Sequence, residues 1–150
     1  MGFLSNLFGD LADPDAVHQP IIDLVCLSIA SDGVITEQEI TQAHTFAVDM
    51  MGVQEPRVAA LVDHTFERIE RDGFHKTLET AAAQLHLDQH REAAFLAAAW
   101  VQHADGHVAR QEEDFLALLA RALHLEVALC DEMLAYVEAQ TKADTLIVDA

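Results

Sequence analysis

The feature that most constrains this fold is a pattern that occurs twice: an apolar segment, an Asp-Gly pair, and then an amphipathic segment. The first copy reads "IIDLVCLSIASDG" and ends at Gly33, and the second reads "REAAFLAAAWVQHADG" and ends at Gly106. A helix that is apolar nearly all round is buried. Glycine readily takes the left-handed conformation that ends a helix, so both glycines are expected to have positive φ. The pattern predicts two buried helices, each closed by a tight turn.

The two copies align at an offset of 73 residues, the separation of Asp32 from Asp105. In each copy a Glu follows seven residues after the Asp, at Glu39 and Glu112. Two supersecondary units of one kind predict a pseudo-symmetric arrangement, in which two helix–Asp-Gly turn–helix units belong to one bundle.

The rest of the chain also favours helices over strands. Of 150 residues, 51% are apolar, only three are Pro and six are Gly, and Val, Ile and Thr form no alternating runs. Hydrophobic periodicity and helix-ending residues predict an all-α, single-domain bundle of about seven helices. The expected helices cover residues 20–31, 37–51, 57–70, 75–85, 89–104, 111–123 and 126–140.

We divide the chain into an N-terminal short helix or arm over 1–19, a helical domain over 20–140 and a C-terminal tail over 141–150. The domain begins at Pro20 because proline suits the first turn of a helix. The arm begins "MGFLSNLFG", whose apolar residues can form one amphipathic turn that either docks on the core or contacts a membrane. The tail is either loose or docked through its aliphatic residues.

The chain is strongly acidic, with 8 Lys and Arg against 26 Asp and Glu and a formal net charge of −18. Such a chain repels phosphate backbones, so no nucleic-acid partner is expected. It attracts metal cations or basic protein surfaces. The longest nearly unbroken apolar run, Ala93 to Val101, has nine residues, and a bilayer needs about 20, so no transmembrane segment is expected. Cys26 and Cys130 are expected to be buried thiols in a reducing cytosol.

The spacing from Gly33 to Glu39 matches the second half of an EF-hand loop. Placing Gly33 at position 6 puts Glu39 at position 12, but it puts Ser28 and Ala30 at positions 1 and 3. The hard oxygen ligands that open such a loop are missing, so an EF-hand is not expected.

Two explanations of the glutamates stay open. Thr36 and Glu39 have the spacing of a capping box, which explains Glu39 without a metal. The same explanation fails for Glu112, because Ala109 cannot cap a helix. Either the acids hold a divalent cation, or the turns are structural and the acidic surface docks a partner.

Motifs for catalysis are missing from the sequence. No Ser or Cys nucleophile carries a motif, no Gly-rich loop can cradle phosphate, and no Glu has a His three residues later. The chain is therefore expected not to be an enzyme.

The segments "VCLSIASDGVITEQE" and "LDQHREAAFLAAAWVQHADGHVARQEEDFLALLARALHL" resemble the TerB family of tellurite-resistance proteins. The resemblance rests on the paired DG-x-x-x-x-x-E segments, each joining two helices, and it covers roughly 20–140. It implies a cytoplasmic, non-enzymatic protein that is associated with resistance to tellurite and other stresses and works near membrane partners. It also implies a divalent-metal site formed by Asp32, Glu39, Asp105 and Glu112.

The second copy departs from the family pattern, because Gly106 is followed by "HVAR" rather than by further acids. A cation there would meet fewer carboxylates and one guanidinium. If consecutive helices alternate in direction, the two turns gather the four acids at one end of the bundle. A third Asp-Gly pair, at Asp72 and Gly73 with Glu79 after it, lies outside the resemblance.

Overall fold

The computed structural model describes residues 14–29, 37–49, 51–104 and 110–149, with the backbone alone described for 14, 15, 39, 103, 104, 110–113 and 141–149. Within these residues all regular structure is α-helical, which confirms the all-α prediction. The seven helices found there are α2 (Pro14–Ile29), α3 (Glu37–Asp49), α4 (Glu55–Asp72), α5 (Phe74–Ala83), α6 (Asp88–Ala104), α7 (Arg110–Ala122) and α8 (Val127–Asp149).

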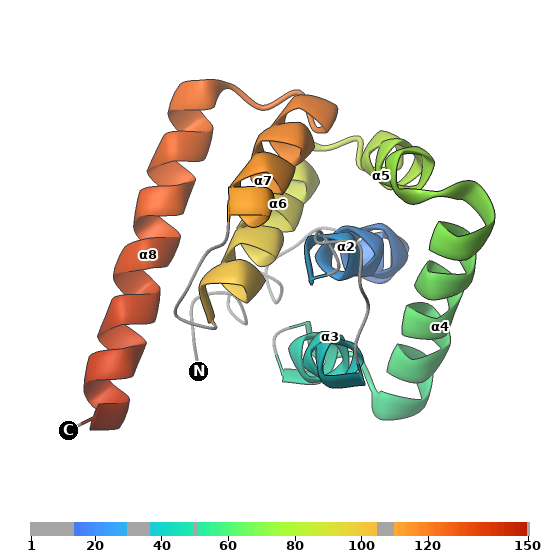
Figure 1. Ribbon diagram of the computed structural model, residues 1–150, viewed down its shortest axis with the longest axis horizontal. Helices are drawn as coiled ribbons and strands as arrows, with labels where there is room; N and C mark the ends of the chain where they lie inside the picture. The colour runs from blue at the N-terminus through green and yellow to red at the C-terminus, as the bar shows by residue number, and fades with distance from the viewer. Residues whose placement is uncertain (1–13, 30–36, 50, 105–109, 150) are drawn as a thin grey trace.

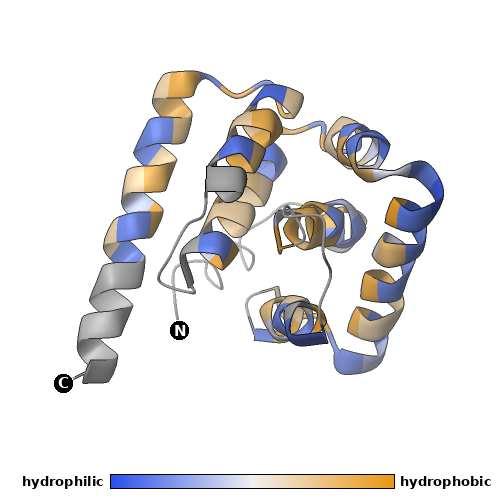
Figure 2. Ribbon diagram, in the orientation of Figure 1, coloured by the Kyte–Doolittle hydropathy of each residue, from blue (hydrophilic) through white to orange (hydrophobic). Residues whose placement is uncertain are grey.

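Helix α2 lies at the centre of the molecule and contacts α3, α4, α5, α6 and α7 (Figure 1). Helices α4 and α8 form opposite edges in this view, and α8 packs on α6. On α4 the hydrophobic residues lie on the side that faces α2, where Val58 and Val62 are buried (Figure 2). The two apolar segments form α2 and α6, and side chains such as Leu24, Leu27 and Phe95 are completely or almost completely buried, as expected.

Helix α2 begins at Pro14, so the prediction that it starts at Pro20 is wrong. A proline inside a helix lacks the N–H that would bond the carbonyl four residues earlier, at a cost of about 3 kcal/mol. Three neighbouring side chains, Val17, Ile21 and Leu24, are at most 3% exposed, and burying each contributes about 1.5–3 kcal/mol. Of these three, only Val17 precedes Pro20, so its burial offsets part of the cost of the lost bond. The boundary expected after residue 19 falls inside a continuous helix.

Helix α8 is also longer than expected, because its backbone continues past residue 140 to Asp149. The segment 127–149 contains neither Gly nor Pro, so nothing in its local sequence ends the helix. The first nine residues of the expected tail are therefore a helical extension (Figure 1).

Glycines with positive φ follow two of the described helices. Gly73 has a φ of 90° and separates α4 from α5, and its N–H donates to the carbonyl of Ile69 at 2.8 Å. Gly52 has a φ of 71° and follows α3. These conformations strain any residue with a Cβ. The corresponding predictions for Gly33 and Gly106 lie outside the described residues.

Helices α3 and α7 correspond in length and position. Each has 13 residues, and their first residues, Glu37 and Arg110, are separated by the same 73 positions as Asp32 and Asp105. That the two units are an internal repeat stays a prediction.

Candidate functional site

Of the four residues expected to bind metal, two are outside the described residues and two are described by their backbone alone. Asp32 and Asp105 belong to segments outside the described residues. Glu39 is the third residue of α3 and Glu112 is the third residue of α7, and only their backbone is described. The expected gathering of their carboxylates stays a prediction.

The described flanks of the two Asp-Gly segments contact each other. Near the end of α2, the hydroxyl of Ser28 donates to the backbone carbonyl of Ala98 on α6 at 3.2 Å. On α3, the Nε2 atom of Gln42 donates to the carbonyl of Val101 at 3.5 Å. The chain before the first segment therefore packs against α6, the helix that leads into the second segment, and the chain after it is joined to α6 by one long hydrogen bond.

The third Asp-Gly pair is not arranged to receive a cation. The carboxylate of Asp72 accepts hydrogen bonds from Nε and Nη2 of Arg71 at 3.0 and 3.1 Å. The hydrogen bond from Arg71 lowers the pKa of Asp72, with smaller contributions from the charges of Arg71, Lys76 and Arg68. In the described part of the chain, no three His, Cys, Asp or Glu side chains gather in a group that can hold a metal ion.

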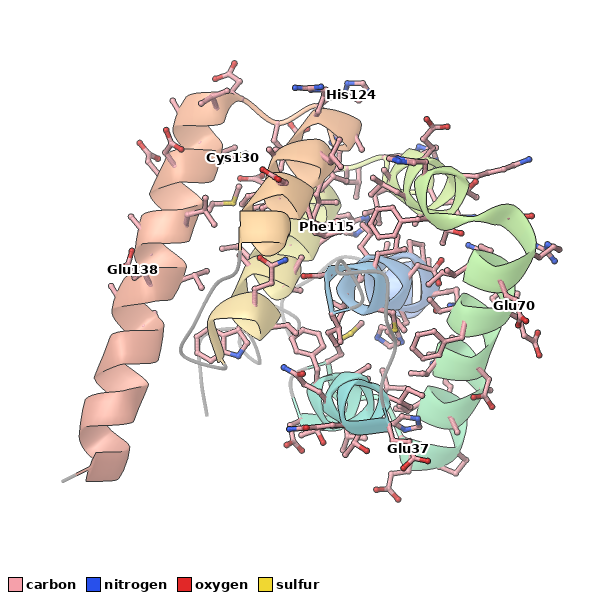
Figure 3. The ribbon with its side chains drawn as sticks, viewed as in Figure 1. Glu37, Glu70, Phe115, His124, Cys130 and Glu138 are labelled. Carbon is pink, nitrogen blue, oxygen red and sulfur yellow. The ribbon has the colours of Figure 1, made fainter. Side chains whose placement is uncertain are left out.

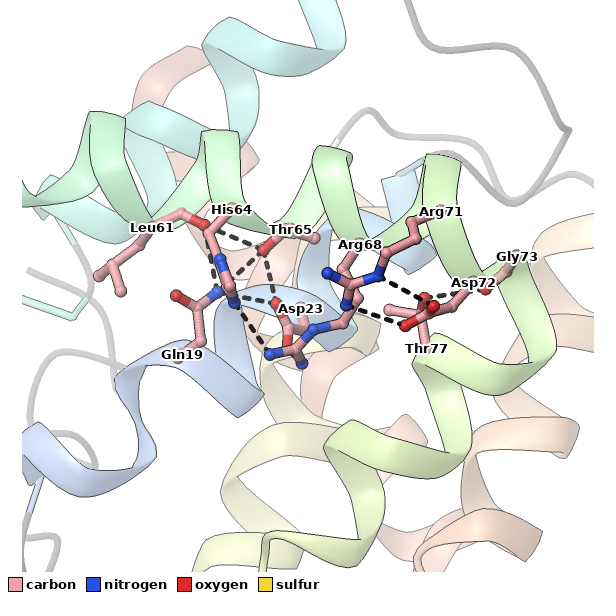
Figure 4. A network of polar contacts seen from close by, with 10 residues as sticks. All are labelled: Gln19, Asp23, Leu61, His64, Thr65, Arg68, Arg71, Asp72, Gly73 and Thr77. Carbon is pink, nitrogen blue, oxygen red and sulfur yellow. Dashed lines mark hydrogen bonds and ion pairs between the residues drawn. The ribbon is translucent and has the colours of Figure 1, made fainter.

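The structure contains one buried ionic network that sequence reasoning missed. Asp23, in the middle of α2, has a side chain with no exposed surface. Its Oδ1 accepts hydrogen bonds from Thr65 Oγ1 at 2.6 Å and from Gln19 Nε2 at 2.8 Å, and its Oδ2 pairs with Arg68 Nη1 at 2.7 Å. Figure 4 shows these residues between α2 and α4, with Arg68 also donating to His64 Nε2 at 3.0 Å.

Burial raises the pKa of Asp23, even though the hydrogen bonds from Thr65 and Gln19 and the charges of Arg68 and His64 oppose the shift. A charged side chain in an apolar interior is tolerated only when it is paired and hydrogen-bonded. The network therefore fixes the position of α4 on α2. The available signal was the single acid within "PIIDLVCLS", because an acid inside an otherwise apolar helix requires a buried partner.

Both cysteines are free and buried, as expected. Burial raises the pKa of the Cys26 thiol, and the nearby charge of Asp23 raises it further. Burial also raises the pKa of the Cys130 thiol, with a smaller contribution from Asp131. Since the thiolate is the nucleophilic form, neither cysteine is activated for catalysis.

A groove runs between α7 and α8, with α6 beneath it, and sequence reasoning did not find it. Its volume is about 730 Å³. The α7 wall includes Leu116, Ala120 and Arg121, and the α8 wall includes Cys130 and Glu138. Figure 3 shows that Cys130 points from α8 toward the neighbouring helices. This groove is a surface that can bind another molecule.

The composition and the described helices define an acidic protein whose regular structure, within the described residues, is all α-helical. A model of the family described as tellurite resistance protein TerB matches residues 18–140. The chain therefore belongs to the TerB family. No curated protein and no solved structure matches the chain. In the part of the chain that the structure describes, no helix combines the length and the apolar character that crossing a bilayer requires.

Proposed function

We propose that this TerB-family protein is a non-enzymatic, cytoplasmic stress-response module that binds a divalent cation through Asp32, Glu39, Asp105 and Glu112. The observations that support the proposal are the packing of α2 on α6 and the single hydrogen bond from Gln42 of α3 to the Val101 carbonyl of α6, which bring the described flanks of the two segments near each other. Carboxylate oxygens are the ligands that hard cations such as Ca²⁺ and Mg²⁺ prefer.

Electrostatics supports the same proposal. Helices α2 and α6 end before the two segments, and α3 and α7 begin after them. Each helix C-terminus carries about half a negative charge and each N-terminus about half a positive charge, so the partial charges of the four helix ends nearly cancel. The four carboxylates, together with Glu37 and Glu113 beside them in the sequence, then give a local negative charge, which Arg110 reduces by one. A divalent cation relieves the repulsion among these acids.

The test is calorimetric titration of the metal-free protein with Ca²⁺, Mg²⁺, Mn²⁺ and Zn²⁺. The double substitution Glu39→Gln and Glu112→Gln is expected to weaken the affinity for the tightest-binding cation at least about tenfold, which corresponds to about 1.4 kcal/mol of binding free energy. The matched control is Glu37→Gln with Asp114→Asn, which removes two exposed charges from the same two helices. The proposal is wrong if wild type and the Glu39, Glu112 double variant bind every cation equally well.

A second candidate function is an interaction scaffold that docks a basic protein or a membrane-associated partner through the acidic surface. The groove favours this candidate, because its α8 wall carries Asp131 and Glu138. The scaffold requires no metal. Partner binding that persists in excess EDTA separates it from the cation module.

A further inference from the structure

The groove exists because small side chains line both of its walls. Ala117 and Ala120 lie on the α7 wall and Ala135 lies on the α8 wall, while Phe95 of α6 lies at the base. Helix α8 packs on α6, so α7 and α8 stand as two separate walls above that helix.

The dimensions of the groove suit a short helix. On α8 the lining runs from Val127 to Glu138, which corresponds to about 16 Å or three helical turns. Its volume of about 730 Å³ lies within the usual range for binding pockets, roughly 300–1,000 Å³. A partner helix presents an apolar stripe at i, i+3, i+4 and i+7 to grooves of this kind.

Apolar surface is exposed at one end of the groove. Val127, at one end, is 77% exposed and is the most exposed large hydrophobic side chain among the described residues. Farther along the walls, Leu134 is half-buried and Leu116 is only 4% exposed. Burial of this surface supplies the hydrophobic contribution to docking.

The charged side chains that line the groove determine which kind of partner helix fits it. Asp131 and Glu138 lie seven residues apart on the same face of α8, and both are exposed residues that line the groove. Arg121 lies on the opposite wall. The overall charge of −18 attracts a basic partner, and the acidic α8 wall fixes which edge of that partner faces α8.

We propose that the groove between α7 and α8 binds one amphipathic helix of a protein partner. This helix carries an apolar stripe and, on the edge that faces α8, two Lys or Arg residues seven positions apart. The proposal rests on the scaffold function and is independent of the cation site. It identifies the docking surface and the chemistry of the partner that fits it.

The test uses a fluorescent synthetic peptide of about 14 residues, with leucines at helical spacing and two lysines seven positions apart. Its dissociation constant with the full chain is measured by anisotropy in excess EDTA, so the result does not depend on the cation site. The variant Asp131→Lys with Glu138→Lys is expected to weaken binding at least about tenfold. A peptide with glutamates in place of the two lysines is expected to recover affinity for that variant.

The matched control is Asp63→Lys with Glu70→Lys on α4, which changes two exposed acids with the same seven-residue spacing. Figure 3 shows Glu70 and Glu138 at opposite edges of the molecule. This control is expected to change affinity less than about twofold, because distant exposed charges are screened by salt. Equal weakening by both double variants would show general attraction to an acidic surface and overturn the proposal.

Three further measurements decide between occupants of the groove. The substitution Ala120→Trp fills the groove and is expected to weaken binding of the lysine peptide. Unchanged affinity for the peptide in the folded variant contradicts the proposal. Removal of apolar side chains at the N-terminus, by Phe3→Ser with Phe8→Ser, is expected to leave affinity unchanged. A large gain in the affinity of this N-terminal variant for the lysine peptide would assign the groove to the chain's own N-terminal segment. A dimer that Ala120→Trp dissolves would assign it to a second copy of this chain.

Discussion

Replacing Arg68 with Leu tests how the buried ionic network stabilises the fold. The substitution leaves the Asp23 carboxylate buried between α2 and α4 without its ion-pair partner. Removing one member of a buried pair typically destabilises a protein by about 3–5 kcal/mol. Asp23 keeps hydrogen bonds from Thr65 and Gln19, so the lower end of that range is expected.

Protonation sets an upper limit on this effect. Protonating a carboxyl group with an ordinary pKa of 3.8 costs about 4 kcal/mol of free energy at pH 7 and about 2 kcal/mol at pH 5. Asp23 escapes the unpaired charge by taking up a proton, so the loss from Arg68→Leu cannot greatly exceed these values. We expect about 3–4 kcal/mol at pH 7 and less than about 2 kcal/mol at pH 5.

The direction of the pH dependence follows from linkage. The pKa of Asp23 is raised in the folded protein, so the stability that this group contributes is present below its unfolded pKa. That contribution is lost as the pH rises through the folded-state pKa. Arg68 lowers the pKa of Asp23, so its removal raises this pKa further and widens the pH window over which stability is lost.

The assay is urea unfolding at pH 5 and pH 7, followed by the fluorescence of Trp100, the single tryptophan, which is buried. Arg71→Leu, on the same helix, is the control, because the exposed Arg71 side chain pairs with its sequence neighbour Asp72 at the surface. No measurable change is expected for this control. A loss below about 1 kcal/mol at pH 7, or equal losses at the two pH values, would refute the reasoning.

Three remaining predictions concern stability. His124 follows α7 with a φ of 57°, a conformation that favours glycine, and the next N–H, that of Leu125, donates to the Ala120 carbonyl at 3.0 Å. The substitution His124→Gly is expected to raise the free energy of unfolding by about 1 kcal/mol. A decrease in that free energy would contradict this prediction. Gly73→Ala is expected to lower it by more than about 1 kcal/mol through backbone strain alone, because an added Cβ meets no atom within 4 Å. Replacing Asp23 and Arg68 together with Leu and Met is expected to be neutral or stabilising by about 1–4 kcal/mol, and a larger loss than from Arg68→Leu would show that the pair itself is needed.

Local sequence was sufficient for several features of the fold. The apolar character of α2 and α6 predicted their burial, because a helix without a polar face must be covered on all sides. The helix end at Gly73 followed from the conformational freedom of glycine. Burial of both cysteines followed from their apolar neighbours. Each inference depends only on residues within a few positions along the chain.

The family also followed from the sequence, since the paired Asp-Gly segments and their flanking helices carry the resemblance that the match over 18–140 establishes. The cation site predicted from the same segments stays a prediction. Its decisive quantity, the distance between the carboxylates of Asp32 and Asp105, depends on side chains outside the described residues.

Tertiary structure decided the features that depend on distant parts of the chain. The start of α2 at Pro14 depends on burial, which offsets part of the cost of Pro20. The pairing of Asp23 with Arg68 joins residues 45 positions apart, and periodicity within one helix cannot identify a partner on another. The groove arises because α8 packs on α6. The small side chains of α8 that line the groove then lie across from the small side chains of α7. Sequence determined which faces are apolar, and the packing of whole helices decided which of those faces remain open.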